Sequence, residues 1–347
     1  MSAIRLSIVI PTILRSSVIQ TVNNCLTLCA GYNVEIVVGV NPLNLYGLEE
    51  QSVLSSLLNI PGLQVKIQNS PKETAEASAF ASIEFAKGEW ILFLGDDDEL
   101  DEKNFEEVFD LLDFNVDFWL LNCNLLYSSG FRSPYYTIGP EPRQVSSGLD
   151  LFKKFGLVTA TTTLSCLLFK KESVDLNLFQ RIESIQGIYS HSFFLFCNFA
   201  SRMVGATNTC FINRKEASSI EVGAALSRYA SNLGIPSTEI FTLGLYKLVE
   251  FASRHTGLEI GEILSFRELE IFKDVKEFSL ANHKVHVTTL GGFISEFVQR
   301  SDYFDTRITR LEHCLYEQGF EKSGDHLILD APVRVTLPAL PGGFSGP

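Results

Sequence analysis

Residues 90–98 read Trp-Ile-Leu-Phe-Leu-Gly-Asp-Asp-Asp, five apolar residues followed by a glycine and three carboxylates. An apolar run of this length is typical of a parallel strand that is buried on both faces. Gly95 lets the chain turn where the strand ends. Asp96, Asp97 and Asp98 repel one another, so ionising all three is unfavourable unless a cation neutralises them. The stretch therefore predicts a buried strand that ends in a cation-binding acidic tip, the name used below for these three residues.

Mg²⁺ and Mn²⁺ match the chemistry of the acidic tip. Both are hard ions that take oxygen ligands, usually one or two carboxylates with waters and substrate phosphates. Such a cation would bridge a diphosphate and stabilise it as a leaving group. The alternative is a solvated helix N-terminus near Glu102, where negative charge interacts favourably with the helix dipole. That alternative accounts for Asp101 and Glu102, but it explains poorly why the run follows a buried strand directly. An EF-hand is a poor match because, with Asp96 as the first position, the sixth would be Asp101 and not glycine.

Strands and helices alternate over the first 130 residues. Apolar, β-branched runs predict strands over 6–10, 34–40, 63–67, 90–94 and 116–127. Helical spacing of apolar residues predicts helices between them, over about 16–29, 73–86 and 102–112. This alternation indicates βαβ units and a mostly parallel sheet flanked by helices. Ligands of such sheets lie beyond the carboxyl ends of the strands. The loops at those ends are 11–15, 41–44 and 95–98.

The rest of the chain divides into three parts. A loop rich in Pro, Gly and Ser over 128–145 is followed by a helix (148–155), a strand (164–169), a helix (191–199) and a strand (204–212). Long helical patterns then run through 227–254, 265–278 and 290–316. We therefore expect an α/β domain over 1–218 and a helical C-terminal region over 219–331. The proline-rich segment 332–347 is expected to be a loop or a disordered end.

Composition limits the kinds of partner. The formal charge of −13 and the lack of a basic stripe disfavour nucleic acid, whose affinity rests on Lys and Arg. The charge also disfavours broad adhesion to anionic lipid, although a local patch could still dock. The apolar runs 90–94 and 193–197 are too short to span a bilayer, and no signal peptide is evident. Seven cysteines without a CxxC pair indicate reduced, buried thiols. We expect a cytoplasmic protein, with peripheral contact at the inner face of the membrane left open.

Three segments together resemble glycosyltransferase family 2. They are 6–12 (Leu-Ser-Ile-Val-Ile-Pro-Thr), 35–38 (Glu-Ile-Val-Val) and 86–98 (Ala-Lys-Gly-Glu-Trp-Ile-Leu-Phe-Leu-Gly-Asp-Asp-Asp), in the family's order and spacing. The resemblance is clear over 4–128, extends to about 215, and covers none of the C-terminal region. The version that ends in Gly-Asp-Asp-Asp is similar to the branch that decorates bacterial surface polysaccharides, including abequosyltransferase-like proteins.

The resemblance implies a GT-A-like Rossmann-type fold and a metal-dependent, inverting glycosyltransferase. The donor would be a nucleoside-diphosphate sugar, and the acceptor a saccharide or a lipid-linked saccharide. Oligomerisation is left open. Carried over by position, Pro11, Thr12 and Arg15 would cradle the nucleotide, and Asn41 would contact the base.

At the acidic tip, the resemblance implies that Asp96 and Asp98 contact Mn²⁺ or Mg²⁺ or the ribose, and that Asp97 also lies against the nucleotide. Two positions depart from the family pattern. Val40 replaces the Asp that usually precedes Asn41, which puts the identity of the base in doubt. Phe80 stands where relatives often have Asn, so that polar contact is missing.

Inversion at the anomeric carbon needs a general base within reach of the acceptor hydroxyl. The segment 181–191 supplies two candidates, His191 and Glu183. A Gly, a Tyr and a His before an aromatic helix are similar to the acceptor segment of the polysaccharide-type relatives, so His191 is a base or a ligand on the metal side. The alternative is that His191 begins the helix with a half-buried ring. Glu183 is weaker because a surface carboxylate needs no explanation.

Two other hypotheses compete with the transferase. A nucleotidyltransferase would need a glycine-rich basic loop after the first strand to hold a triphosphate, and residues 10–15 contain no glycine. A non-catalytic relative that binds a nucleotide or a partner is favoured by Val40 and Phe80 and opposed by the intact acidic tip. A defined glycosidic product would decide between them.

Overall fold

The computed structural model describes a large part of the chain. The described residues are 4–42, 45, 47–69, 72, 75–126, 132–136, 141–157, 161, 163–185, 190–215, 245–263, 266, 320–323, 326–329 and 333–336. They fall into two compact units, one formed by 1–184 with 191–216 and the other by 185–190 with 217–347. Each unit is described separately below.

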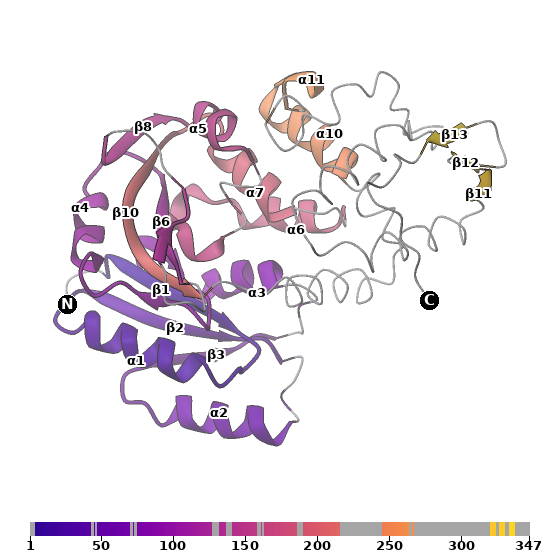
Figure 1. Cartoon of the computed structure of the whole chain (residues 1–347). Coiled ribbons are helices and arrows are strands. Elements are labelled where there is room, and N and C mark those ends of the chain that lie inside the picture. The colour runs from indigo at the N-terminus through magenta and orange to yellow at the C-terminus, as the bar shows by residue number, and fades with distance from the viewer. Residues whose placement is uncertain are drawn as a thin grey trace. The chain divides into compact units, whose positions relative to one another are not determined.

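The first unit is built on one large sheet (Figure 1). Its strands are β1 (Leu6–Thr12), β2 (Val34–Val40), β3 (Gln64–Ile67), β4 (Trp90–Phe93), β5 (Glu99–Leu100), β6 (Phe118–Leu126), β7 (Arg132–Pro134), β8 (Arg143–Ser147), β9 (Leu167–Lys170) and β10 (Met203–Lys215). The order is β3-β2-β1-β4-β9-β6-β10-β5, with β7 paired to β6 and β8 to β10. β1, β2, β3, β4, β6 and β10 share one direction, and β9 runs against its neighbours β4 and β6. The carboxyl ends of six strands therefore meet at one edge.

Helices cover both faces of this sheet. They are α1 (Val18–Leu28), α2 (Leu48–Leu58), α3 (Ala75–Ser82), α4 (Val108–Leu111), α5 (Gly148–Phe155), α6 (Leu176–Glu183) and α7 (Ser190–Phe199). Short 3₁₀ turns occupy Ile83–Phe85, Phe105–Glu107, Leu164–Cys166 and Lys171–Ser173. α1 and α2 lie on one face of the sheet, and α3, α6 and α7 lie on the other (Figure 1).

The core follows directly from the apolar runs. Leu6, Ile8, Val9 and Ile10 of β1 are fully buried, as a central strand covered on both faces requires. β4 is buried along its whole length. The predicted mostly parallel α/β sheet flanked by helices is confirmed.

The second unit contains both helices and strands among its described residues. They are α10 (Leu245–Thr256), α11 (Ile260–Ile263), β11 (Phe320–Ser323), β12 (His326–Leu329) and β13 (Val333–Thr336). The three strands form an antiparallel sheet. α10 lies partly within the predicted helical pattern 227–254, whereas the patterns 265–278 and 290–316 lie almost wholly outside the described residues. Strands β11 and β12 lie in the region expected to be helical, and β13 lies inside the segment expected to be a loop or a disordered end.

Four local expectations in the first unit also changed. β8 lies largely within the predicted loop 128–145, and residues 164–166 form a 3₁₀ turn before β9. The helix expected from Glu102 is a 3₁₀ turn at Phe105–Glu107 followed by the four-residue α4. Helix α6 was not anticipated, although Leu178, Phe179 and Ile182 give it one buried face.

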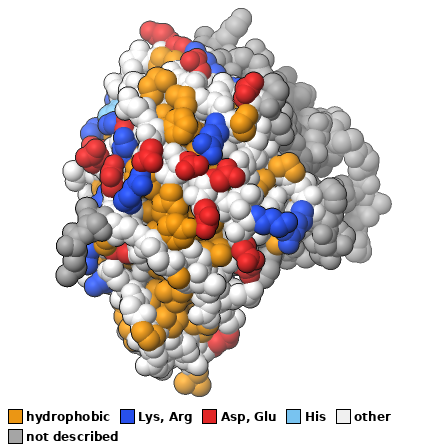
Figure 2. All heavy atoms as spheres, turned by 90° about the vertical axis from the view of Figure 1, so that its left-hand side faces the viewer, with side chains coloured by type: hydrophobic (Ala, Val, Ile, Leu, Met, Phe, Trp, Pro, Cys, Tyr) orange, Lys and Arg blue, Asp and Glu red, His pale blue; other side chains and the backbone are white. Residues whose placement is uncertain are grey.

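The surface carries both signs of charge. On the side that lies to the left in Figure 1, acidic and basic side chains are interspersed among apolar ones (Figure 2). Within the described part of the chain, no helix is both long and apolar enough to cross a membrane.

Candidate functional site

The candidate site begins where the sheet changes its winding direction. From β1 the chain passes to β2 and β3, and then crosses to β4 on the other side of β1. Open parallel sheets bind ligands at this switch point. Here the Thr12 hydroxyl, at the end of β1, donates to Asp96 Oδ2 at 2.5 Å, and the Leu14 N–H donates to the Thr12 oxygen at 2.8 Å. The loop after β1 is therefore tied to the acidic tip after β4.

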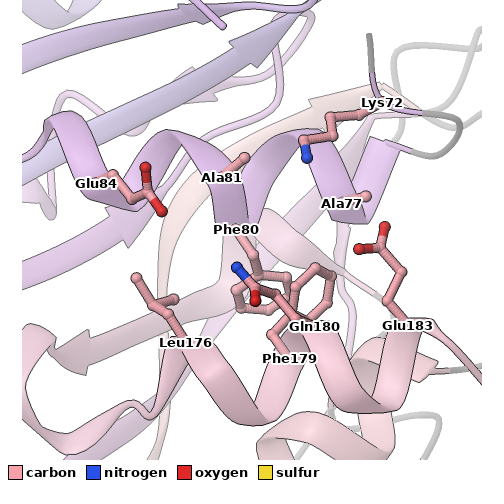
Figure 3. A pocket seen from close by; sticks show the side chains of 9 residues that line it. All are labelled: Lys72, Ala77, Phe80, Ala81, Glu84, Leu176, Phe179, Gln180 and Glu183. Atoms are coloured by element: carbon pink, nitrogen blue, oxygen red, sulfur yellow. The ribbon is translucent and has the colours of Figure 1, made fainter. Parts of the chain in front are cut away.

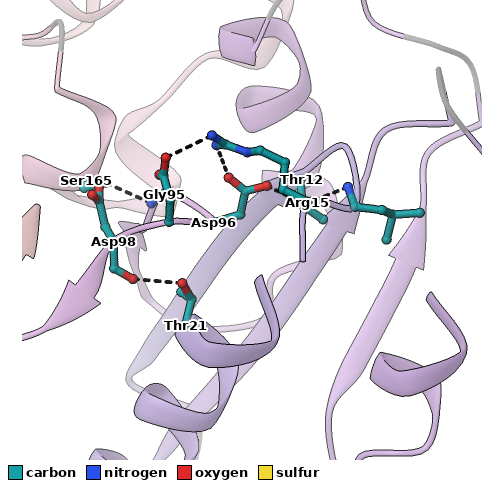
Figure 4. A network of polar contacts seen from close by, with 9 residues as sticks. Thr12, Arg15, Thr21, Gly95, Asp96, Asp98 and Ser165 are labelled. Atoms are coloured by element: carbon teal, nitrogen blue, oxygen red, sulfur yellow. Dashed lines mark hydrogen bonds and ion pairs between the residues drawn. The ribbon is translucent and has the colours of Figure 1, made fainter. Parts of the chain in front are cut away.

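Arg15 joins two members of the acidic tip (Figure 4). Its guanidinium pairs with Asp96 Oδ1 and, at 2.9 Å, with Asp97 Oδ2. Asp96 is only 2% exposed, and both of its carboxylate oxygens are engaged. Burial raises the pKa of Asp96, while the Arg15 charge and the Thr12 hydrogen bond act against this increase. The structure thus brings Thr12, Arg15, Asp96 and Asp97 together, with Pro11 adjoining Thr12 in β1.

Asp98 is held from a different direction. The Ser165 hydroxyl donates to Asp98 Oδ2 and accepts the Gly95 N–H at 2.8 Å. The Asp98 carbonyl accepts from the Thr21 hydroxyl of α1 at 2.9 Å. Burial raises the pKa of Asp98 to about 6, although Ser165 and the charge of Arg214 both lower it.

The helix-terminus alternative does not account for this arrangement. The first helical turn after the acidic tip begins at Phe105, and strand β5 lies between them. The influence of a helix dipole is confined to its first turn. The negative charge of Asp96, Asp97 and Asp98 therefore needs another explanation.

Two carboxylates converge over Gly95. A Cβ atom on Gly95 would lie 2.9 Å from Asp98 Oδ2 and 3.2 Å from Asp97 Oδ1. The absence of a side chain on Gly95 therefore lets two hard oxygen donors, which match Mg²⁺ or Mn²⁺, come together in a cradle over it. Across the described ranges, no cluster of three or more His, Cys, Asp or Glu forms a complete metal site. The protein would accordingly supply part of the shell, and substrate phosphates and water the rest. Asp97 and Asp98 fit this role better than Asp96. Both Asp96 oxygens have partners, whereas among the described residues Asp97 and Asp98 each have only one carboxylate oxygen so engaged.

The loop before β9 connects the acidic tip to further polar residues. Its alternate residues Thr161, Thr163 and Ser165 contact different elements. Thr161 donates to Ser192 of α7 at 2.6 Å, and Thr163 accepts from Arg214 of β10 at 2.7 Å. These contacts place Arg214 and the start of α7 on the Asp98 side of the site.

Sequence reasoning missed Thr163, Ser165 and Arg214. The signal for Ser165 was a single serine within the apolar run 164–169. Arg214 follows the predicted strand 204–212 at the same sheet edge as the three loops that were singled out.

His191 lies near the start of α7 and is 6% exposed. Its Nε2 atom is 3.3 Å from the Ser192 hydroxyl, which in turn receives the Thr161 hydrogen bond. His191 is therefore linked to the loop that also reaches Asp98. Its nearly buried ring agrees with the view that it begins an aromatic helix, and its role as a base stays a prediction.

Glu183 lies in a separate pocket between α3 and α6 (Figure 3). The pocket is lined by Lys72, Ala77, Phe80, Ala81, Glu84, Leu176, Phe179, Gln180 and Glu183. Burial raises the pKa of Glu183, and the nearby Lys72 lowers it. Asn41 holds the backbone of Lys72 by two hydrogen bonds of 2.8 and 3.1 Å. Glu183 thus belongs to the Asn41 side of the site, away from the residues around Ser165.

Comparison with known proteins identifies neighbours in structure but not in sequence. No protein-family model matches the chain, and no curated protein matches it. Residues 1–349 of TarS from S. aureus superpose with a TM-score of 0.51 at 13% identity, covering 95% of this chain and 98% of that one. The same TarS fragment in complex with UDP-GlcNAc gives 0.53 at 14% identity, covering 95% and 99%. A longer TarS structure gives 0.52 at 12% identity, covering 96% of this chain and 60% of that one.

At these identities the likeness concerns the fold alone. It confirms the predicted GT-A-like α/β fold. The abequosyltransferase-like branch is not supported by these neighbours and stays a prediction.

Proposed function

We propose that this protein is a glycosyltransferase that moves a sugar from a nucleoside-diphosphate sugar to a saccharide acceptor, with Mn²⁺ or Mg²⁺ at the acidic tip. The observation that carries the proposal is the cradle of Asp97 and Asp98 over Gly95 at the switch point of the sheet. TarS shares the fold and has been solved with UDP-GlcNAc, so UDP-sugars are the first donors to test.

The three carboxylates of the acidic tip have different partners, which supports one role for Asp97 and Asp98 and another for Asp96. Asp97 and Asp98 would hold the cation, which would neutralise the leaving diphosphate. Asp96 instead orients Arg15, because both of its oxygens are bound to Arg15 and Thr12. The Arg15 side chain is still 52% exposed, so its planar guanidinium can also bind a phosphate.

The donor and acceptor would approach from opposite sides of Asp98. Pro11, Thr12, Arg15 and Asn41 lie at the ends of β1 and β2, which we assign to the nucleotide. The acceptor would then enter on the side of Ser165 and Arg214. A bacterial surface saccharide, free or lipid-linked, is the acceptor class to test. The sugar transfer would take place in the cytoplasm, at the inner face of the membrane.

This geometry favours His191 over Glu183 as the general base. His191 is linked through Ser192 and Thr161 to the acceptor side, whereas Glu183 shares a pocket with Lys72 beside Asn41. Proton transfer requires that the acceptor hydroxyl come within hydrogen-bond reach of the His191 ring. His191→Gln should abolish transfer and retain donor binding, and Glu183→Gln should retain both. The reverse pattern would assign the base to Glu183.

Product analysis tests the function itself. The full chain is incubated with Mn²⁺, a panel of nucleotide sugars and a panel of saccharides, and the products are identified by mass spectrometry. A defined glycoside that depends on both Mn²⁺ and Asp98 is the expected result. Metal-dependent binding without any glycoside would favour a non-catalytic, nucleotide-binding relative, since Val40 already departs from the family pattern. Absence of donor binding would contradict the proposal.

A further inference from the structure

Ser165 joins the backbone and the carboxylate of the acidic tip. It lies in the 3₁₀ turn before β9 and is 3% exposed. Its oxygen accepts the Gly95 N–H at 2.8 Å, and its hydroxyl donates to Asp98 Oδ2 (Figure 4). A serine hydroxyl has a single proton, so this proton is committed to Asp98. The orientation of the Asp98 carboxylate is therefore set by a residue from a distant part of the chain.

The oxygen that Ser165 binds is the one that faces the cradle. Asp98 Oδ2 lies 2.9 Å from the position that a Gly95 Cβ would take. A carboxylate oxygen has more than one acceptor position, so Oδ2 can bind Ser165 and still contribute to a cation shell. Without Ser165, the Asp98 carboxylate would be free to turn toward Arg214, whose charge already acts on it.

We propose that Ser165 is a positioning residue, which holds the Asp98 carboxylate in the orientation that binds the cation of the donor diphosphate. The inference rests on the proposed function and deepens it, because it places part of the metal site on the loop before β9. Residues that hydrogen-bond to a metal ligand typically change metal affinity by about 10- to 100-fold when they are removed.

The chain contains a matched control at the opposite end of β4. Ser7 is fully buried, accepts the Gly88 N–H at 2.7 Å and donates to Glu35 Oε1 at 2.5 Å. Ser7 thus makes the same two kinds of hydrogen bond as Ser165: it accepts from a glycine N–H and donates to a carboxylate. Gly88 precedes β4 and Gly95 follows it, so Ser7 lies at the edge away from the acidic tip. Ser7→Ala removes an equivalent pair of hydrogen bonds without touching Asp98.

The test measures Mn²⁺ binding by the full chain in the presence of UDP. Bound Mn²⁺ is obtained from the electron paramagnetic resonance signal of the free ion, and thermal unfolding is recorded without metal. Ser165→Ala should weaken Mn²⁺ binding about 10- to 100-fold. Ser165→Thr keeps the hydroxyl and should recover most of the affinity. Ser7→Ala should bind Mn²⁺ as the wild type does, although both alanine variants should unfold at lower temperature.

The other outcomes would each contradict the inference, and they can be told apart. Wild-type Mn²⁺ affinity in Ser165→Ala would overturn the role of Ser165 and leave the proposed function intact. Equal loss in Ser165→Ala and Ser7→Ala would show a general effect of stability and also overturn it. No Mn²⁺ binding by the wild type would overturn the metal-dependent function together with the inference. Should Ser165→Ala fail to fold, Ser165→Cys, which has a slightly larger side chain and only a weak donor, gives the same comparison.

Discussion

At the scale of single residues, Asp98 carries its charge where water is largely excluded. Burial raises its pKa from 3.8 to about 6 in the folded protein. Between these pH values the folded state binds more protons than the unfolded state, so stability falls as pH rises through this window. Above about pH 6 the Asp98 carboxylate is ionised in both states, and its burial lowers the free energy of unfolding by its full amount. A bound cation would offset it, because a cation favours the ionised form.

Removing the buried charge of Asp98 should therefore stabilise the metal-free protein. Asp98→Asn removes the buried charge and keeps an oxygen for Ser165. We expect it to raise the free energy of unfolding by up to about 3 kcal/mol at pH 7.5 with chelator present. At pH 4 the gain should largely vanish, because the wild-type carboxyl is then protonated when folded. Urea denaturation at both pH values measures this, and a gain that does not depend on pH would contradict the account.

The cradle over Gly95 makes a second prediction at this scale. The methyl group of Gly95→Ala would lie 2.9 Å from Asp98 Oδ2, which is too close for an ordinary contact and would displace the carboxylate that we assign to the cation. We expect the Mn²⁺ dependence of UDP binding to disappear in calorimetric titrations. Gly261→Ala is the control, since among the described residues no atom beyond its chain neighbours and its own helix backbone lies within 4 Å of the added carbon. Unchanged, metal-dependent binding in Gly95→Ala would show that the cation lies elsewhere.

The residues that sequence reasoning could predict are those that follow parallel strands. Thr12, Arg15 and the acidic tip come directly after apolar runs, and the structure places them together. Ser165 was not predicted because it precedes a strand. That strand, β9, is antiparallel to β4 and β6, so it begins at the sheet edge where they end. A single sequence does not reveal that reversal of direction.

At the scale of helices and strands, Phe80 connects several elements. Its ring lies 5.4 Å from that of Phe93 in β4, and 4.7 Å from those of Phe179 in α6 and Phe194 in α7. It is 1% exposed. The departure from the Asn that the resemblance led us to expect is thus accounted for by packing, because a polar side chain here would lack partners in the aromatic cluster.

Replacing Phe80 by the Asn that the resemblance predicts should destabilise the protein. Phe80→Asn removes a buried ring and buries an amide in its place, so we expect it to lower the free energy of unfolding by about 3–5 kcal/mol. Urea denaturation at pH 7.5 measures the change. Leu58→Ala is the control, since Leu58 is 61% exposed in α2 and should change stability little. A Phe80→Asn variant as stable as the wild type would show that the aromatic cluster does not join these helices.

Several strands and helices with clear apolar patterns were predictable, whereas α2 and β8 were not. The spacing of α1 and the apolar runs of β1, β2 and β4 identified these elements. α2 was missed because its apolar residues do not form one stripe, and Leu48 at its start is 88% exposed. β8 was missed because its short, polar sequence depends on pairing with β10.

At the scale of the whole molecule, the first unit contains every residue assigned to the donor and the cation. Its sheet and the helices on both faces enclose a core of their own. The alternation of strands and helices was sufficient to predict its fold class, since βαβ units permit few arrangements. The C-terminal region was harder to predict, because β11, β12 and β13 are short strands that follow long helical patterns.

A fragment of residues 1–216 should fold independently. A unit with its own core generally can. We expect cooperative thermal unfolding and the same Mn²⁺-dependent UDP affinity as the full chain. Circular dichroism and calorimetry measure these properties. A fragment that unfolds without cooperativity would show that the second unit is needed for the fold of the first.

The central claim is that the acidic tip binds a nucleoside diphosphate through a divalent cation. Its most direct test is thermal unfolding of the wild type and of Asp98→Ala with a panel of nucleoside diphosphates, with and without Mn²⁺. A ligand at 100 times its Kd stabilises a protein by about 2.7 kcal/mol, which raises the melting temperature measurably. We predict that one diphosphate stabilises the wild type only with Mn²⁺, and that Asp98→Ala abolishes the effect. If no diphosphate stabilises the wild type with Mn²⁺ present, the acidic tip does not bind a donor and the proposed function is wrong.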